Sequence, residues 1–318
     1  MTQERSRILS LLAFIVLLFL APLFLETYYM HLVVLVFIYV IVTSSLRTIY
    51  LSGQLSLGHA AFMGIGAYTS AILAKHVGWS PWVTLPIGGL GAMTVGILIG
   101  FPFARLRAIY FSMGSLFFGI MITSLVGLAP KLTGHYTGLS RIPRLFGYSK
   151  VPYYYFFLVL TLLILLILYR IEQSRIGMTF KAVSQSYLAA SSRGINEAGV
   201  RILALGVGGF FAGIAGAGYA HYSTFIAPTH FGFMPSIFLV VYLLAGGTQS
   251  FAGPIVGTSV FYLIPYVMGA LEGYAPFVLA GALAVVIFFI PQGMVSLPGQ
   301  FRSWIGKLRE RGVSGDAS

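Results

Sequence analysis

The residues best placed to do chemistry in this chain of 318 residues lie between Gly53 and Tyr68, where small and polar residues interrupt an otherwise apolar sequence. They recur at positions 56, 60, 63, 64 and 67, a spacing that places them on one stripe of a helix. Polar groups that face lipid are costly, so this stripe must face protein or water. The wall of a solute pathway and a tight contact between two helices explain it equally well. If it is a pathway wall, the lining residues are Ser56, His59, Gly64 and Ala67.

The remaining reactive residue types do not form a recognisable catalytic or metal-binding set. His59 is better explained as a hydrogen-bonded interior histidine than as a proton relay. His221 and His230 lie nine residues apart without a third ligand at metal spacing. The chain has no Cys, and its sequence contains no GxSxG elbow, no HExxH helix and no Walker A motif. We therefore expect no catalytic residue, no metal and no cofactor. If ATP drives this protein, another polypeptide must hydrolyse it.

The positions of the acidic residues argue against one class of transporter. The acidic residues are Glu4, Glu26, Glu172, Glu197, Glu272, Glu310 and Asp316, and none lies in the middle of an apolar run. Carriers that are driven by protons or sodium usually hold ionisable groups inside the membrane. Because the sequence offers no such group, secondary transport is disfavoured.

The composition explains why these residues belong in a membrane. Hydrophobic residues make up 58% of the chain and charged residues 8%, against about 25% charged residues in a typical soluble domain. The apolar runs are continuous rather than alternating, which excludes a β-barrel. We predict an all-α, polytopic membrane helix bundle with about ten transmembrane helices. Their expected ranges are residues 8–25, 29–46, 55–74, 82–104, 108–128, 153–170, 199–220, 234–250, 254–271 and 275–291.

The distribution of basic residues predicts the orientation of this bundle. With a cytoplasmic N-terminus, 14 of the 19 Lys and Arg residues lie on the cytoplasmic side, in agreement with the positive-inside rule. Residues 1–28 then hold a cytoplasmic N-terminus and an uncleaved first helix, 29–298 the membrane core, and 299–318 a cytoplasmic tail. The net charge of +12 is scattered over short loops without an aromatic-interleaved basic face, so nucleic-acid binding is not expected.

Two connecting loops are long enough to have structure of their own. The outer loop, Pro130–Pro152, should pack over the outer mouth of the bundle. The inner loop, about residues 171–199, is predicted to hold a short amphipathic helix, with Gly194 at the position of a C-terminal cap. The apolar residues at near-helical spacing are Ile176, Phe180, Val183, Tyr187 and Leu188.

Glycine pairs four residues apart recur at Gly96 and Gly100, Gly209 and Gly213, and Gly253 and Gly257. Such pairs let the backbones of two helices approach closely. We favour ordinary packing inside a bundle as their role over a moving interface or a pore.

Four segments, taken in order, resemble the M-type permease subunits of branched-chain amino-acid ABC importers, over about residues 29–300. The first is the Gly53–Tyr68 stretch, and the second is Arg105–Phe111, which is similar to an element that opens the next span. The third, Lys181–Asn196, resembles the family's coupling loop, a divergent form of the EAA loop. The fourth combines Ala245–Pro254 with Pro291–Gly293. Each segment alone is weak, but their order together with the topology is specific.

The resemblance implies an ABC importer permease fold in a bacterial cytoplasmic (inner) membrane. It implies a pathway for leucine, isoleucine and valine. The implied partners are a second homologous permease subunit of the H type, two cytoplasmic ATP-binding subunits, an external substrate-binding protein and membrane lipid. Related permeases carry urea or short amides, and no residue here excludes those substrates. A facilitative channel working alone is a weaker alternative, because it leaves the amphipathic loop unexplained.

The resemblance also assigns a role to the inner loop, which should contact the ATPase. The implied coupling residues are Phe180, Val183, Leu188, Ala189, Ala190 and Gly194. This loop departs from the family pattern, because Gln185, Tyr187 and Ser191 stand where acidic residues are usual. Its ion pairs with the ATPase should therefore differ. The outer loop also lacks the family's usual Thr-Gly-Gly run, so the outer mouth should differ as well.

Overall fold

The computed structural model describes residues 16–267, together with positions 274, 277, 281, 284 and 293–296. Nearly all of this part is helical, and its isolated β-bridge pairs Leu139 with Ile226. Six helical segments are long and apolar enough to cross a membrane. They are α2 (Thr27–Tyr50), α4 (Pro81–Phe103), α5 (Ile109–Gly127), α7 (Lys150–Gln173), α10 (Glu197–Ser223) and the run Pro228–Gly246, which contains α11 (Phe233–Gly246). The all-α membrane bundle is thus confirmed.

The predicted count of about ten spans is not confirmed by the described residues. Two further expected spans correspond to shorter helices, α3 (His59–Ile72) and α12 (Gly253–Val267). Most of the predicted span 275–291, the tail 299–318 and the first half of 8–25 lie outside the described residues. Of the first span, residues 16–20 are helical and Ala21–Leu23 form a 3-10 turn.

The start of α3 corrects one predicted boundary. A helix was expected from residue 55, but Gly53 has a φ of +84° and α3 begins only at His59. The peptide groups of Leu55 and Leu57 bond to serines of α5 instead of to a preceding helical turn. Ser56 therefore lies in a non-helical segment, and it does not share a helical stripe with residues 60, 63, 64 and 67. The far end of α3 continues into one π-helical turn, Leu73–Val77.

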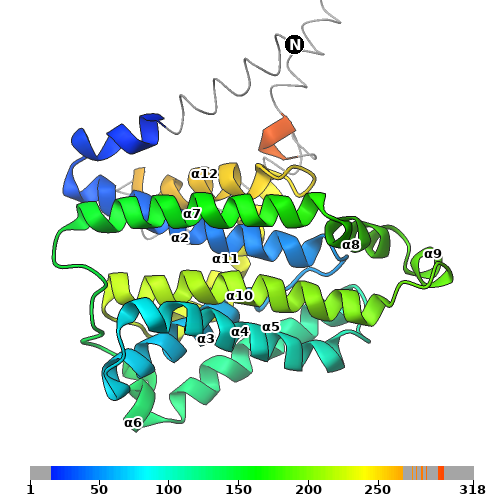
Figure 1. Ribbon diagram of the computed structural model, residues 1–318, viewed down its shortest axis with the longest axis horizontal. Coiled ribbons are helices and arrows are strands. Elements are labelled where there is room, and N and C mark those ends of the chain that lie inside the picture. Colours follow the sequence, from blue (N-terminus) through cyan, green and yellow to red (C-terminus); the bar gives the residue numbers. More distant parts are fainter. Residues whose placement is uncertain are drawn as a thin grey trace, which may run out of the picture.

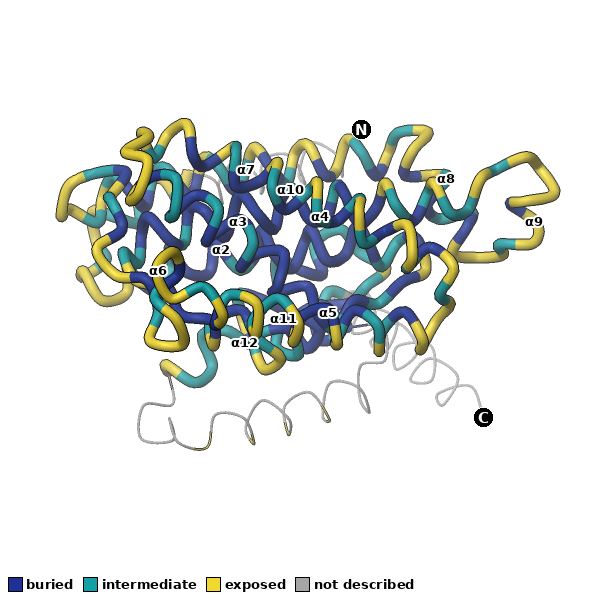
Figure 2. The backbone as a smooth tube through the Cα atoms, turned by 90° about the horizontal axis from the view of Figure 1, so that it is seen from below, coloured by how far each residue is buried: buried dark blue, intermediate teal, exposed yellow. Residues whose placement is uncertain are grey.

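Helix α10 runs through the centre of the molecule, between two groups of helices (Figure 1). It packs against α4, α3 and α2, while α2 also packs against α7 and α12. The buried backbone lies in the middle of the bundle and the exposed backbone at its ends and outer faces (Figure 2). A central helix in contact with three others fixes the frame on which the remaining elements are placed.

Glycines explain how closely these helices approach, as their spacing predicted. A Cβ atom added at Gly216 of α10 would lie 1.9 Å from the carbonyl oxygen of Met63 in α3. One at Gly66 of α3 would lie 2.2 Å from the carbonyl oxygen of Gly213, and one at Gly96 of α4 would lie 2.8 Å from that of Leu205. The packing role predicted for the glycine pairs is confirmed, because backbone meets backbone at these crossings.

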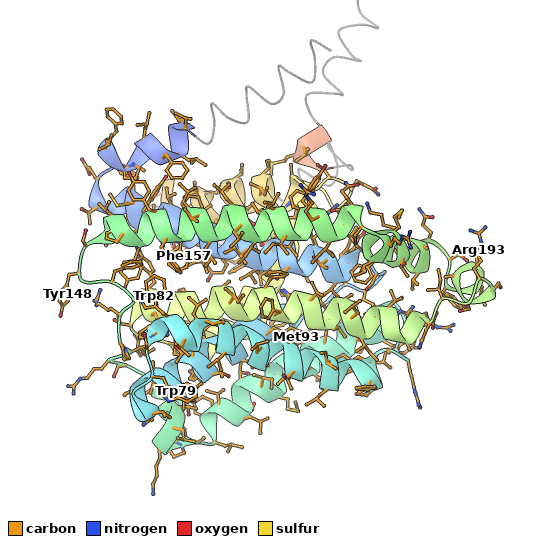
Figure 3. All side chains as sticks on the ribbon, viewed as in Figure 1. Trp79, Trp82, Met93, Tyr148, Phe157 and Arg193 are labelled. Atoms are coloured by element: carbon orange, nitrogen blue, oxygen red, sulfur yellow. The ribbon has the colours of Figure 1, made fainter. Side chains whose placement is uncertain are left out.

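The outer faces of α4, α5 and α7 are apolar. Exposed large apolar side chains on these helices include Leu98, Phe101, Phe117, Leu125, Leu163 and Leu166. Such faces suit contact with lipid tails. Trp79, Trp82 and Tyr148 gather near one end of the molecule, while Arg193 lies at the opposite end (Figure 3).

The outer loop begins with α6 (Pro130–Thr133) and a 3-10 turn at His135–Thr137. Its bridge joins Leu139 to Ile226, with N–O distances of 2.8 and 3.0 Å. Lys75 donates to the carbonyl oxygen of Ser140 at 2.8 Å. The loop is thus attached to the connections that follow α3 and α10. Its role over an outer mouth stays a prediction.

A buried arginine on α10 closes the other end of the bundle. Arg201 donates to the carbonyl oxygens of Ala104 and Leu106, at 3.1 and 3.4 Å, just after α4 ends. It also lies 3.8 Å from the carboxylate of Glu197, one turn earlier on α10. These bonds satisfy carbonyl groups that the end of α4 leaves without helical partners.

Candidate functional site

The four predicted pathway residues are all buried. His59, Gly64 and Ala67 lie on α3, and Ser56 lies just before it. The Nε2 atom of His59 is 2.8 Å from the hydroxyl oxygen of Ser45 on α2. At Gly64, an added Cβ would lie 2.8 Å from the Cβ of Phe231. The structure therefore places these residues inside helix packing, and their role in lining a pathway stays a prediction.

The segment before α3 is held by two other helices. Ser112 of α5 donates to the carbonyl oxygen of Leu55 at 2.7 Å, and the amide of Leu57 donates to Ser115 Oγ at 2.9 Å. The amide of Ala60, in the first turn of α3, donates to Ser236 Oγ on α11 at 3.2 Å. Movement of α5 or α11 would therefore be felt at the start of α3.

Three side chains near this helix start carry buried polar atoms that have no hydrogen-bond partner among the described residues. They are both amide atoms of Gln54, the hydroxyl of Ser56 and Nδ1 of His59. Buried polar groups are nearly always paired, because an unpaired one costs about 1–3 kcal/mol. These groups are therefore the candidates for contact with water or with a polar solute. Gln54 was not among the predicted residues, although its polar side chain in an apolar context was a visible signal.

The inner loop forms two helices and not the single one that was predicted. They are α8 (Arg175–Gln185) and α9 (Tyr187–Ser192). The hydroxyl of Ser174 accepts from the amide of Ile176 at 3.2 Å, which caps α8. The hydroxyl of Ser186 accepts from the amide of Ala189 at 3.3 Å, which caps α9. A serine cap of this kind starts a new helix, so the chain turns at Ser186. The pair extends beyond one end of the bundle (Figures 1 and 2).

Gly194 ends α9 in the way that the sequence predicted. Its φ is +78°, and its amide donates to the carbonyl oxygen of Ser191 at 2.9 Å. The next amide, of Ile195, donates to the carbonyl oxygen of Ala190 at 3.1 Å. This pair of bonds is a Schellman motif, which favours glycine because of its positive φ.

The six predicted coupling residues divide into two groups. Phe180, Val183 and Ala190 are buried, so they attach the loop to the rest of the chain. Leu188, Ala189 and Gly194 are exposed. Only the second group is free to contact another protein directly. Nearby, the guanidinium group of Arg107 lies 3.9 Å from the ring centre of Tyr187, which holds α9 against the α4–α5 connection.

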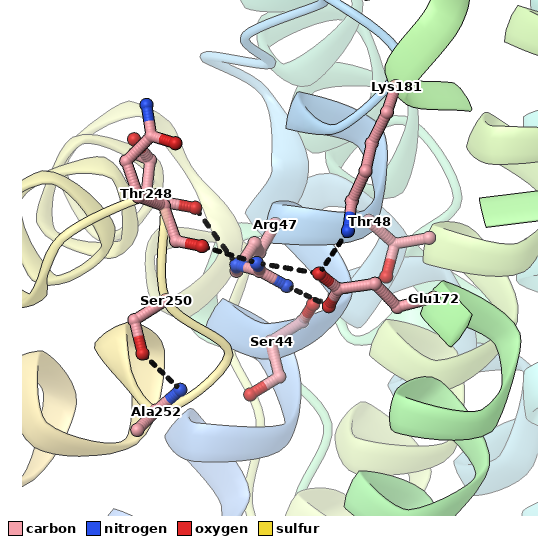
Figure 4. Close-up of polar contacts among 9 residues, drawn as sticks. Ser44, Arg47, Thr48, Glu172, Lys181, Thr248, Ser250 and Ala252 are labelled. Carbon is pink, nitrogen blue, oxygen red and sulfur yellow. Dashed lines mark hydrogen bonds and ion pairs between the residues drawn. The ribbon is translucent and has the colours of Figure 1, made fainter. Parts of the chain in front are cut away.

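A buried ion-pair network lies where α8 meets the bundle (Figure 4). Arg47, in the last turn of α2, donates from Nη1 and Nη2 to the two carboxylate oxygens of Glu172, at 2.5 and 3.1 Å. Lys181 of α8 lies 2.9 Å from the same carboxylate. Arg47 also donates to the carbonyl oxygens of Thr248 and Gln249, at 3.1 and 3.4 Å. Arg47 and Glu172 together thus join α2, α7, α8 and the turn between α11 and α12.

Open grooves flank this network. One, of about 330 Å³, lies between α8, the end of α2 and the α11–α12 turn, and its lining includes Lys181, Ser184 and Gln249. A second, of about 270 Å³, shares Tyr50 and Ser184 with the first and includes Leu55. Both grooves therefore lie beside the end of α2 and the end of α8.

Sequence reasoning missed this network. Arg47 and Glu172 were each assigned to loops, although Arg47 directly follows a long apolar run and Glu172 is a rare acid within a basic region. The available signal for an ion pair was a single acidic residue, Glu172, among basic residues at the end of a predicted span. The pairing itself required the fold, since 125 positions separate the two residues. Among the described residues, no group of three or more His, Cys, Asp or Glu could hold a metal ion.

Comparison with known proteins agrees with this architecture. The family model described as "Branched-chain amino acid transport system / permease component" matches residues 28–291. The chain is similar to the high-affinity branched-chain amino acid transport system permease protein LivM of Escherichia coli (strain K12), with 29% identity over 292 aligned residues, 83% of this chain and 69% of that protein. LivM of Salmonella typhimurium is 28% identical over 289 residues, 82% of this chain and 68% of that protein. No solved structure matches the chain at a significant level.

Proposed function

The chain belongs to the family of branched-chain amino acid transport system permease components, and on that premise we propose that it forms part of the pathway of an ATP-driven importer for leucine, isoleucine and valine. The observation that carries the proposal is the family match over residues 28–291, which spans the described bundle and the inner loop. The permease is a transport subunit and not an enzyme. Its work comes from ATP hydrolysed on separate subunits.

The proposed assembly has four kinds of component. This chain pairs with a second, H-type permease in a bacterial cytoplasmic membrane, two ATPases bind from the cytoplasm, and a soluble protein delivers the amino acid from outside. Both termini lie in the cytoplasm. In support, the exposed apolar faces suit lipid, and α8 and α9 project from the end opposite to Trp79 and Trp82.

The solute is proposed to pass the polar groups at the start of α3. Gln54, Ser56 and His59 offer buried donors and acceptors that no described residue satisfies. Gly64 and Ala67, further along α3, are proposed to line the same path, which requires Phe231 to move away from Gly64. Because Ser112, Ser115 and Ser236 hold this segment, movements of α5 and α11 would change access to it.

Coupling is proposed to run through α8 and α9. The exposed residues Leu188, Ala189 and Gly194 contact the ATPase, while Phe180, Val183 and Ala190 transmit its movement to the bundle. A ligand or partner shifts a conformational equilibrium only if it binds the two states differently. The docking contact must therefore differ between the nucleotide-bound and nucleotide-free ATPase.

The deciding experiment measures uptake of labelled leucine by cells with and without this gene, at low external concentration. Loss of uptake on deletion, with recovery when the gene is restored, supports the proposal. Depletion of ATP should abolish the restored uptake, whereas equilibration that survives depletion would indicate a facilitative channel. Unchanged uptake in a strain without another leucine system would overturn the assignment of substrate.

A further inference from the structure

The ion-pair network around Arg47 joins α8 to the turn between α11 and α12, and these two parts of the molecule line the larger groove. On one side, Lys181 belongs to α8, which follows α7 after a single capping serine. On the other side, Thr248 and Gln249 form the turn between α11 and α12. Arg47 contacts Glu172 with two nitrogens and the turn with two further bonds. In the described part of the chain, no other ion pair takes part in a connection between α8 and this turn.

The two halves of the network differ in their contact with water. The side chains of Arg47 and Glu172 are only 4% and 8% exposed, so neither charge can lose its partner without a large penalty. Lys181 is 44% exposed, and its pairing with the same carboxylate is correspondingly weaker. The link from α2 to α7 is therefore firm, while the link from α8 is the one that can break and re-form.

The turn that Arg47 contacts cannot bend freely by itself. A Cβ atom added at Gly253 would lie 1.8 Å from the carbonyl oxygen of Gly247, and one at Gly257 would lie 2.0 Å from that of Tyr242. With backbone against backbone at two levels, α11, α12 and their turn must move together. A pull on the carbonyl oxygens of Thr248 and Gln249 would therefore move both helices.

We infer that Arg47 is a positioning residue for energy coupling, which transmits displacement of α8 to the α11–α12 turn and so sets the width of the groove between them. This inference rests on the proposed function, because it assigns the ATPase as the source of the displacement. The groove of about 330 Å³ is lined from both sides that the network joins, by Lys181 and Ser184 on α8 and by Thr248 and Gln249 on the turn. Its polar opening is suited to release of an amino acid into the cytoplasm.

The first test uses the complete importer in proteoliposomes and measures leucine uptake and ATP hydrolysis together. Arg47→Gln should lower the uptake per ATP about tenfold while the complex still hydrolyses ATP. Arg47→Lys keeps the charge but cannot make the bidentate contact, so it should recover only part of the ratio. Tyr153→Phe on α7 is the control: it removes a buried hydroxyl that also donates to backbone carbonyl oxygens, those of Phe146 and His221, but at the end of the bundle opposite to α8 and α9. It should leave the ratio unchanged.

The second test measures the groove directly. Because the chain has no Cys, Gln249→Cys gives this subunit a single thiol, and labelling is measured on this subunit after separation from its partners. In the parent complex, maleimide labelling of that cysteine should differ between the nucleotide-free and the vanadate-trapped states. With Arg47→Gln, the two labelling rates should become equal. A merely structural role for Arg47 would lower assembly or thermal stability but would not remove this nucleotide dependence from the complexes that form.

The outcomes separate this inference from the proposed function. A parent complex without ATP-driven leucine uptake would refute the function. The inference alone would be refuted if the parent complex is active and Arg47→Gln shows the same uptake per ATP and the same difference in labelling between nucleotide states. If Arg47→Gln does not assemble, Lys181→Gln replaces it, because its half-exposed side chain is not needed for folding. That variant should lower the uptake per ATP about threefold, and an unchanged ratio would overturn the inference.

Discussion

At the scale of single residues, Gly216 sets the distance between α10 and α3. A Cβ at this position would lie 1.9 Å from a carbonyl oxygen of α3, so Gly216→Ala must push the two helices apart. Overpacking of this kind costs about 1–3 kcal/mol, or more where backbone must move. We expect a fall of several degrees in the melting temperature of the purified protein in detergent. Gly147→Ala is the control, since its added methyl group meets open space. Equal melting temperatures for the two variants would contradict the packing.

Residue types predicted part of the site but not which residues come together. The stripe of small residues on α3, the helix cap at Gly194 and the interior position of His59 could be predicted from the local sequence, because helical spacing decides which residues share a face. The pairing of Arg47 with Glu172 does not, since it depends on how α2 and α7 meet. The polar side chain of Gln54 was visible in the sequence, but its burial without a partner was not, because burial of one side chain is a property of the whole fold.

At the scale of elements, α9 leaves Leu188 65% exposed at the end of the bundle that we propose faces the cytoplasm. Leu188→Asp should reduce recovery of the ATPase with the permease and lower leucine uptake by about an order of magnitude. The stability of the permease itself should change by no more than about 0.5 kcal/mol, because the side chain packs against little of its own chain. Co-purification and thermal unfolding measure the two effects.

Leu132→Asp is the matched control for this experiment. Leu132 is also an exposed leucine, at 50%, but it lies on α6 at the other end of the molecule. Its substitution should leave recovery of the ATPase unchanged. If both variants lose the ATPase equally, general damage explains the result and α9 is not the docking element.

Apolar runs predicted the long helices well, since α2, α4, α5, α7 and α10 each cover an expected span to within a few residues. The predicted helix boundaries were wrong where contacts with other segments replace helical hydrogen bonds. The segment before α3 bonds to α5, and Ser186 divides the inner loop because its hydroxyl caps a new helix. Neither choice is encoded in hydrophobic periodicity, which reports only which face of a segment is buried.

At the scale of the whole molecule, the two ends of the bundle should face different compartments. Tyr148 is 88% exposed near the tryptophan end, and Arg193 lies at the end where α8 and α9 project (Figure 3). A membrane-impermeant maleimide should label Tyr148→Cys in intact spheroplasts, and Arg193→Cys only after permeabilisation. The chain contains no other cysteine to confuse the measurement. The reverse pattern would invert the proposed topology and move α9 away from any cytoplasmic ATPase.

The class of the whole molecule was predictable because so few charges cannot cover a water-exposed surface. Its internal arrangement was not, since hydropathy gives the number of candidate spans and their direction but not their neighbours. The central place of α10 follows from glycines that allow contact on several sides, and only the packed structure shows which helices take those sides.

The glycine crossings also limit how the molecule can move. Where peptide groups touch without side chains between them, a helix cannot slide or rotate by a fraction of a turn without collision. Helices α3, α4 and α10 therefore form one rigid body, and α11 with α12 forms a second. The first body meets the second where the amide of Ala60 donates to Ser236 Oγ on α11, and α12 meets α2 through the 3.0 Å hydroxyl pair of Thr258 and Thr43. We therefore expect the elementary motion of the protein to be a shear between two stiff units.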